Sequence, residues 1–198
     1  MRKLTYYVAC SVDGFIAQSN GAHDGFSQEQ DYLAEIFSTF PETVPSHLRA
    51  AMGIQSENQC FDTVLMGRKT YEIGLQEGIT SPYSHMKQYL FSRTLSESPD
   101  PAVELIFQQP IERVMALKQA AGKGIWLCGG ATLAATLFSQ HLIDQLILKV
   151  NPFLMGAGIP LFSEAIAQTA LTLTERHDYQ NGVMRLHYQV NPHNDTVE

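Results

Sequence analysis

Short apolar runs and amphipathic segments alternate through the middle of this chain, and that alternation limits the fold more than any other feature. Apolar runs such as residues 61–66 and 125–128 end at glycines, and each is followed by a segment with the apolar spacing of a helix. Strands that alternate with helices pair in parallel, so the pattern predicts an α/β fold with a mostly parallel central sheet flanked by helices. The expected strands cover residues 4–10, 61–66, 88–92, 103–107, 125–128, 143–150, 171–177 and 183–190, and the expected helices begin near residue 27 and cover 46–52, 68–73, 110–121 and 131–138.

The two ends of the chain depart from this alternation. Asn181-Gly182 stands between the last two expected strands, and this dipeptide is a strong turn signal that predicts an antiparallel C-terminal hairpin. Near the other end, Ser27 precedes acidic residues and a helical apolar pattern, which predicts Ser27 as the N-cap of the first helix. We expect one domain over residues 1–190, followed by a polar tail over 191–198.

The composition is that of a globular protein, with 44% apolar and 17% charged residues. A net charge of −7 argues against a nucleic-acid partner, because phosphate binding requires a basic surface. No apolar stretch approaches the ~20 residues of a membrane helix, and the N-terminus lacks the apolar core of a signal peptide, so we expect a cytoplasmic protein with no membrane partner. Cys10, Cys60 and Cys128 are scattered and lack metal-ligand spacing, so neither a disulfide framework nor a metal site is expected.

Two strand–glycine–helix junctions are the candidates for ligand binding. In open α/β sheets, ligands bind beyond the carboxyl ends of the strands, where helices present free N–H groups. Neither junction is a GxGxxG fingerprint or a Walker P-loop, and a single junction of this kind is more often an ordinary turn. Two in one domain, one with adjacent cations, favour a split dinucleotide site. The first contains Gly67, Arg68, Lys69 and Thr70, and the second contains Gly129, Gly130, Ala131 and Thr132.

Three segments carry a family resemblance. Residues 66–74, Met-Gly-Arg-Lys-Thr-Tyr-Glu-Ile-Gly, resemble a segment of dihydrofolate reductases, as do Phe91-Ser92-Arg93 and the glycine pair in residues 128–131. The rest of the chain resembles the reductase domain of bifunctional riboflavin-biosynthesis enzymes and their stand-alone relatives, most clearly over residues 11–17, 142–146 and 152–162. The resemblance implies a dihydrofolate-reductase-like fold, NADPH as cofactor, a small-molecule substrate and a homodimer.

The resemblance also implies individual roles at the cofactor. The first junction would hold the pyrophosphate, with Arg68 also within reach of the 2′-phosphate, and the second would line the pyrophosphate and the nicotinamide ribose. Ser92 and Arg93 would distinguish NADPH from NADH, because a guanidinium pairs closely with a phosphate dianion. Ala9 and Ile16 would flank the nicotinamide ring and exclude water from the hydride path.

Reduction of a C=N or C=O group also requires a proton source. Phe26 and Asp31 have the spacing of the Trp and the pterin-binding Asp of dihydrofolate reductases, so Asp31 is one candidate acid. A solvent-facing carboxylate favoured by the helix dipole explains Asp31 equally well. Glu29 is the neighbouring alternative. Asp13 is a third candidate, although a turn-forming role fits its Asp-Gly context better.

We therefore expect an NADPH-dependent reductase that transfers a hydride to a small pteridine-type, pyrimidine-type or carbonyl substrate. A non-catalytic nucleotide-binding module of the same fold is the alternative, and a flavin-binding oxidoreductase is a third hypothesis with no direct support. Phe26 stands where dihydrofolate reductases have Trp, and the zinc signature of the riboflavin-pathway deaminase is missing. We therefore do not expect the bifunctional riboflavin enzyme.

Overall fold

The structure is a computed structural model, and it describes residues 1–192 apart from the side chains of Gln30 and Asp31. The eight-stranded sheet has the order β5-β4-β3-β6-β1-β7-β10-β9. From β5 to β7 all neighbours are parallel, and β10 pairs antiparallel with both β7 and β9. The predicted mostly parallel sheet and C-terminal hairpin are therefore confirmed. The strands of this sheet are β1 (Leu4–Ser11), β3 (Phe61–Gly67), β4 (Lys87–Phe91), β5 (Val103–Ile106), β6 (Gly124–Gly129), β7 (Gln145–Asn151), β9 (Leu171–Asp178) and β10 (Met184–Val190).

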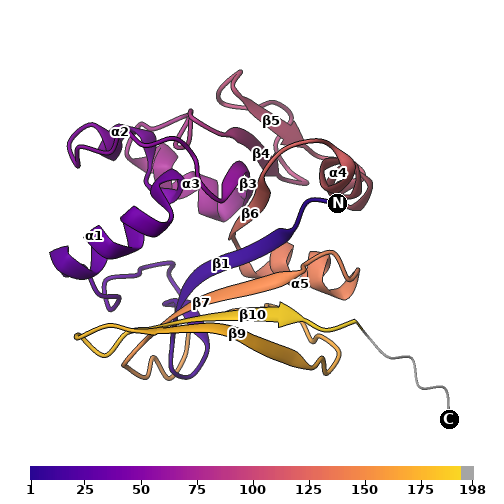
Figure 1. Cartoon of the computed structure of the whole chain (residues 1–198). Helices are drawn as coiled ribbons and strands as arrows, with labels where there is room; N and C mark the ends of the chain where they lie inside the picture. Colours follow the sequence, from indigo (N-terminus) through magenta and orange to yellow (C-terminus); the bar gives the residue numbers. More distant parts are fainter. Residues whose placement is uncertain (193–198) are drawn as a thin grey trace, which may run out of the picture.

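Helices cover both faces of this sheet. Figure 1 shows α1 and α3 on one side of the strands and α4 and α5 on the other, and the two core clusters agree with this division. Within the described residues, no helix has both the length and the apolar character needed to cross a bilayer. The helices are α1 (Gln30–Thr39), α2 (Ser46–Arg49), α3 (Arg68–Gln76), α4 (Pro110–Gln119) and α5 (Ala131–Ser139), with a 3-10 turn η1 (Pro41–Thr43).

The core is divided between the two faces of the sheet because successive strand residues point in opposite directions. Tyr6 belongs to the cluster that contains residues of α4 and α5, whereas Tyr7 belongs to the cluster that contains Phe40 and Trp126. A third cluster joins α1 to the β9–β10 hairpin through the edge-to-face contact of Tyr32 with Tyr179. The α1 face thus combines residues from both ends of the chain.

The first helix begins later than its capping pattern predicts. Its N-cap is Glu29, so the prediction of Ser27 in that role is wrong. Ser27 is instead held by long-range hydrogen bonds: its backbone N–H donates to Asn151 Oδ1 (3.1 Å), and its hydroxyl accepts from Asn181 Nδ2 (3.0 Å). These partners tie the segment before α1 to the end of β7 and to the hairpin.

The segment from residue 41 to 60 has little regular structure, and a buried carboxylate organises it. Glu42 is fully buried and accepts backbone hydrogen bonds from Gln59 (3.1 Å), Cys60 (2.7 Å) and Phe61 (2.7 Å). Only Ser46–Arg49 of the helix expected over 46–52 is helical. Residues 193–198 of the expected polar tail lie outside the described residues.

Candidate functional site

The two predicted glycine junctions meet at one crevice. They follow neighbouring strands, β3 and β6, with Met66 opposite Gly129 in the ladder. A Cβ placed on Gly67 would lie 3.2 Å from the backbone nitrogen of Gly130, and one on Gly129 would lie 3.2 Å from Thr70 Oγ1. Gly129 also has φ of 145°, which side chains rarely tolerate, and its peptide bond to Gly130 is cis. The absence of side chains therefore lets the two turns approach closely, and a Cβ on Gly67 or Gly129 would crowd Gly130 or Thr70.

Two helices begin at this crevice, and both N-termini lack neutralising groups. Gly67 is the N-cap of α3 and Gly130 is the N-cap of α5, and neither helix has a side-chain cap or an acidic residue in its first turn. The first N–H groups of a helix have no partner within the helix, and the helix dipole gives this end partial positive charge. The crevice thus offers two sets of backbone donors to an anion.

The predicted cations differ in whether they already form an ion pair. Arg68 is ion-paired with Glu72 (3.0 Å), while Lys69 and Arg93 are exposed. Arg93 follows β4, which lies beside β3, with Phe91 directly opposite Gly67. The Ser92 hydroxyl is buried and accepts hydrogen bonds from the N–H groups of the two residues after Arg93, at 3.2 and 3.1 Å. Ser92 therefore holds the turn that presents Arg93.

The other predicted cofactor residues come from strands near the start of the chain and from the first turn of α5. Ala9 is half-buried near the end of β1, and Ile16 is half-buried in β2 (Phe15–Ala17), which pairs with β8 (Ile159–Pro160) in a separate small ribbon. Ala131 is buried in the first turn of α5, and the exposed Thr132 accepts a hydrogen bond from Ser163 (3.0 Å).

Asp13 acts as a loop anchor in the structure. Its carboxylate accepts hydrogen bonds from the Ser11 hydroxyl (2.5 Å) and from the backbone N–H groups of Met155 (3.0 Å) and Gly156 (2.7 Å). These bonds lower the pKa of Asp13 to about 2. A carboxyl with this pKa carries almost no proton at neutral pH, so its geometry suits holding the β1–β2 turn against the loop after β7.

The two other predicted acids lie at the start of α1. Glu29 is the exposed N-cap residue, and its side chain makes no capping hydrogen bond. Asp31 is in the first turn of the helix, and its side chain lies outside the described residues. Its role as an acid therefore stays a prediction.

A lysine that sequence reasoning missed lies on the α1 face of the sheet. Lys149 is in β7, directly opposite Ala9 of β1, and its ammonium lies 4.8 Å from the centroid of the Tyr7 ring. Burial lowers the pKa of Lys149 to about 8, an effect that Cys128 at the end of β6 partly opposes. A single lysine in an apolar strand is not part of a recognisable sequence motif. Its position relative to the glycine crevice follows only from the order of the strands in the sheet.

Beside this lysine, the α1 face contains several buried polar atoms without hydrogen-bond partners among the described residues. They are Tyr7 Oη, Tyr179 Oη, Arg185 Nε and Nη1, and His187 Nε2. Among the described residues, Arg185 forms an ion pair only through Nη2, with Glu175 (2.8 Å). Buried polar groups are normally satisfied, so this region has free capacity to bind a polar ligand or water.

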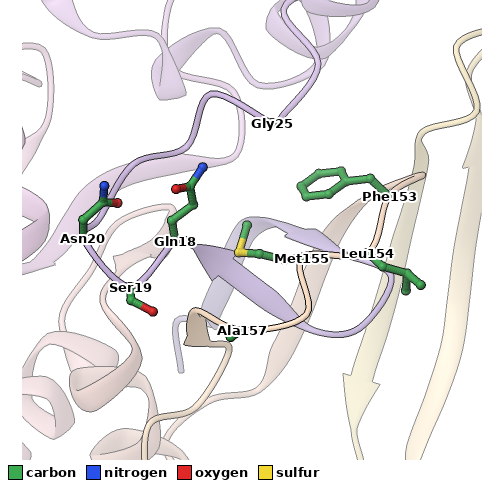
Figure 2. A pocket seen from close by; sticks show the side chains of 8 residues that line it. All are labelled: Gln18, Ser19, Asn20, Gly25, Phe153, Leu154, Met155 and Ala157. Atoms are coloured by element: carbon green, nitrogen blue, oxygen red, sulfur yellow. The ribbon is translucent and has the colours of Figure 1, made fainter.

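A hollow of about 500 Å³ opens at the same carboxyl edge of the sheet. It lies between the loop after β2 and the loop after β7, and Figure 2 shows Gln18, Phe153 and Met155 around it. The Phe153 ring also contacts Phe26 just before α1 (5.3 Å between centroids). The lining offers amides, hydroxyls and apolar groups but no acid or base: Gln18, Ser19, Asn20, Gly25, Phe153, Leu154, Met155 and Ala157.

Comparison with protein families identifies the class. The model of the RibD C-terminal domain family matches residues 2–184, so the chain belongs to that family. The uncharacterized protein YwjB of Bacillus subtilis (strain 168) is 32% identical over 187 residues, which cover 94% of this chain and 97% of YwjB. The uncharacterized protein YyaP of the same organism is 27% identical over 201 residues, with 96% of each chain covered.

Solved structures support the same fold. A protein of Shewanella sp. PV-4 named for riboflavin biosynthesis superposes with a TM-score of 0.70 at 23% identity, covering 96% of this chain and 99% of that one. A pyrimidine reductase-like protein of Corynebacterium diphtheriae superposes with a TM-score of 0.59 at 15% identity, covering 96% and 92%. Within the described residues, no group of three or more His, Cys, Asp or Glu side chains could hold a metal ion.

Proposed function

We propose that this chain is an NADPH-dependent reductase of small heterocyclic substrates, of pteridine or pyrimidine type, or of a carbonyl substrate. The observation that carries this proposal is the close approach of the two glycine turns, where a Cβ added to Gly67 would lie 3.2 Å from the Gly130 nitrogen, with a helix N-terminus without a side-chain cap behind each turn. A cradle of bare backbone donors suits a pyrophosphate, because the donors are fixed before the ligand binds. When bound, the reduced nicotinamide supplies a hydride.

Each side of the crevice has its own task in this proposal. The first turns of α3 and α5 bind the pyrophosphate, with Thr70 between the two glycine turns. The exposed guanidinium of Arg93 binds the 2′-phosphate, since it forms no ion pair within the described residues. Ala9 and Ile16 exclude water beside the nicotinamide, because both present small or apolar surfaces.

The acceptor would occupy the hollow between residues 18–25 and 153–157 (Figure 2). Its amides and hydroxyls can hydrogen-bond the edge of a planar heterocycle, and the Phe153 ring provides an apolar surface for its face. Fixed polar groups in a mostly neutral lining are typical of small-molecule sites. The Asp13 anchor keeps one wall of this hollow in place.

Calorimetry with NADPH and NADH, followed by NADPH oxidation with pterins, folates, pyrimidine intermediates and simple carbonyls, tests the proposal. We expect NADPH to bind at least about ten-fold more tightly than NADH, a difference of ~1.4 kcal/mol. We also expect oxidation with at least one acceptor. Tight NADPH binding without any turnover would favour a non-catalytic nucleotide-binding module, and failure to bind either nucleotide would contradict both.

A homodimer, which the resemblance implies, is also part of the proposal. Strand β9 is the outer edge of the sheet, and its Leu171 and Leu173 side chains are 39% and 49% exposed. An unpaired edge with apolar side chains is a surface on which a second copy can pair. Light scattering should give twice the chain mass for the wild type, and Leu173→Asp should shift it toward one chain mass. A wild-type monomer would contradict this assignment.

A further inference from the structure

A second hollow, of about 440 Å³, lies beside α2 and the turn before β4. Its lining includes Ser46, Arg49, Ser84 and His85, and it shares no lining residue with the hollow between residues 18–25 and 153–157. Ser84 and His85 precede β4, whereas the two glycine turns follow β3 and β6. This hollow is therefore separate from the proposed cofactor and acceptor sites.

A relay of three hydrogen bonds runs from the hollow to the backbone behind it. The Ser84 hydroxyl donates to Ser46 Oγ (3.0 Å), and Ser46 Oγ lies 3.0 Å from His85 Nδ1. His85 Nε2 lies 2.8 Å from the Glu42 carbonyl oxygen. A carbonyl oxygen only accepts, so Nε2 carries the ring hydrogen, and Nδ1 of the neutral ring accepts from the Ser46 hydroxyl. The three bonds therefore share one direction, from Ser84 to Glu42.

Ser84 is the open end of this relay. It is exposed, whereas Ser46 and His85 are half-buried. The Ser46 oxygen accepts from the Ser84 hydroxyl and from the Ser84 backbone N–H (2.8 Å), so both of its lone pairs are occupied. Within the described residues, the Ser84 oxygen accepts no hydrogen bond. The geometry of a nucleophile, a base within hydrogen-bonding reach and a group that orients the base is that of an activated serine.

The base of the relay is held in place and is neutral at neutral pH. Burial lowers the pKa of His85 below its ordinary value of 6.5, and the hydrogen bond to the Glu42 carbonyl partly opposes this effect. Of the nearby charges, the Arg49 guanidinium lowers the pKa of His85 and the Glu42 carboxylate raises it. The backbone carbonyl of His85 accepts from Asn58 Nδ2 (2.9 Å), which fixes the turn that carries the ring.

The rest of the lining suits an ester. Arg49 donates to the carbonyl oxygens of Pro41 (2.5 Å) and Ser56 (2.6 Å), and it forms no ion pair among the described residues. A fixed cation stabilises the negative oxygen that develops when a carbonyl group is attacked. Ala50 and Ile54 add apolar surface that can contact a short acyl chain.

We propose that this hollow hydrolyses small carboxylic esters, with Ser84 as nucleophile, Ser46 as relay and His85 as base, an activity separate from the proposed reductase function. Ser84 Oγ bonds to the acyl carbon, and the π electrons of the C=O bond move to its oxygen. The Ser84 proton passes to Ser46, and the Ser46 proton passes to His85. The C=O bond then re-forms, the bond to the alcohol breaks, and the alcohol oxygen takes the proton back through the relay. Water hydrolyses the acyl-Ser84 ester in the same way, so one ester and one water give one carboxylic acid and one alcohol.

The hydrolysis of p-nitrophenyl acetate by the full chain is the first test. We expect Ser84→Ala and His85→Gln each to lower kcat/KM about 100-fold, the usual contribution of a positioned base. Ser96→Ala, at an exposed serine outside the hollow, and His47→Gln, at an exposed histidine beside α2, are the matched controls and should keep the wild-type rate. A wild-type rate in Ser84→Ala would overturn the proposal.

The relay itself is tested by Ser46→Ala, which keeps both the nucleophile and the base. We expect hydrolysis to fall as far in Ser46→Ala as in His85→Gln. The wild-type rate should rise with pH to a plateau, with a midpoint below 6.5, because the base must be neutral, and His85→Gln should lose this step. A full rate in Ser46→Ala, or the same pH step in His85→Gln, would overturn the relay. Ser84→Ala should melt within about 2 °C of wild type, since Ser84 is exposed.

Covalent labelling gives a readout independent of turnover. Diisopropyl fluorophosphate transfers its phosphoryl group to an activated serine with loss of fluoride, and mass spectrometry of the peptides locates the label. We expect the label on Ser84 in wild type and at least about ten-fold less of it in Ser46→Ala and His85→Gln. Label on Ser46, or equal label on Ser84 and Ser96, would overturn the proposal. Neither measurement uses NADPH, so their failure leaves the reductase proposal untouched.

Discussion

The proposed cofactor crevice and the proposed acceptor side differ in the chemical groups that form them. The crevice consists of backbone groups: two glycine turns, two helix N-termini, and turns in which side chains such as Ser92 only hold the chain in place. The proposed acceptor side, the hollow between residues 18–25 and 153–157, consists largely of side chains from two loops, among them Gln18, Phe153 and Met155.

This difference has a chemical reason. A pyrophosphate has the same shape in every NADPH molecule, so a fixed arrangement of N–H donors can bind it. A Cβ in the crevice would obstruct this contact. An acceptor varies in shape and hydrogen-bonding pattern, so side chains must define its site. We therefore expect substitutions in the crevice to affect NADPH affinity and substitutions on the acceptor side to affect turnover.

The largest expected effect on affinity comes from Gly129→Ala. The added Cβ would lie 3.2 Å from Thr70 Oγ1, in a residue whose φ of 145° already disfavours alanine. We expect at least about a 100-fold loss of NADPH affinity, equal to ~2.8 kcal/mol, measured by calorimetry. Gly78→Ala is the matched control, because Gly78 also has positive φ (77°) but nothing within 4 Å of an added Cβ. Equal NADPH affinity in both variants would contradict the crevice assignment.

A smaller effect is expected at the edge of the crevice. Arg93→Ala should weaken NADPH binding about ten-fold (~1.4 kcal/mol) and leave NADH binding unchanged, because only NADPH carries the 2′-phosphate. Arg68→Ala should weaken the binding of both nucleotides, since the resemblance places Arg68 at the pyrophosphate. Arg176→Ala, at an exposed arginine of β9, serves as the control. An equal loss for NADPH and NADH in Arg93→Ala would remove Arg93 from the 2′-phosphate.

The smallest effect concerns the loop anchor. The folded-state pKa of Asp13 is about 2, below its ordinary value of 3.8, so its contribution to stability is present above pH 3.8 and is lost as the pH falls through 2. The melting temperature of wild type should therefore fall more steeply between pH 4 and pH 2 than that of Asp13→Asn. Glu77→Gln, at an exposed carboxylate after α3, should keep the wild-type slope. An unchanged slope in Asp13→Asn would rule out the anchor.

Much of the fold could be predicted because its signals are local. The alternation of strands and helices and the Asn181-Gly182 turn define the sheet and the hairpin within short windows of sequence. The ribbon of β2 with β8 was missed because strands of three and two residues have no measurable periodicity. The N-cap was misplaced because Ser27 bonds to Asn151 and Asn181, which are distant in sequence.

The candidate site likewise has one part that local sequence patterns predict and another part that they do not. The residues of the glycine crevice lie within two short motifs, so their meeting follows once β3 and β6 are neighbours. Lys149, Tyr7 and Cys128 come from three strands and meet only through the register of the sheet, which no local pattern specifies. Asp13 was identified as a candidate acid, but two of the three hydrogen bonds that fix its charge come from a loop near residue 155, which is distant in sequence.

A crystal structure with NADP⁺ is the most direct measurement of the central claim, which is that one dinucleotide spans both glycine turns. The account predicts a pyrophosphate within hydrogen-bonding distance of the first N–H groups of both α3 and α5, with the 2′-phosphate at Arg93. A nucleotide bound elsewhere on the molecule, or one that contacts only one of the two helix N-termini, would contradict it.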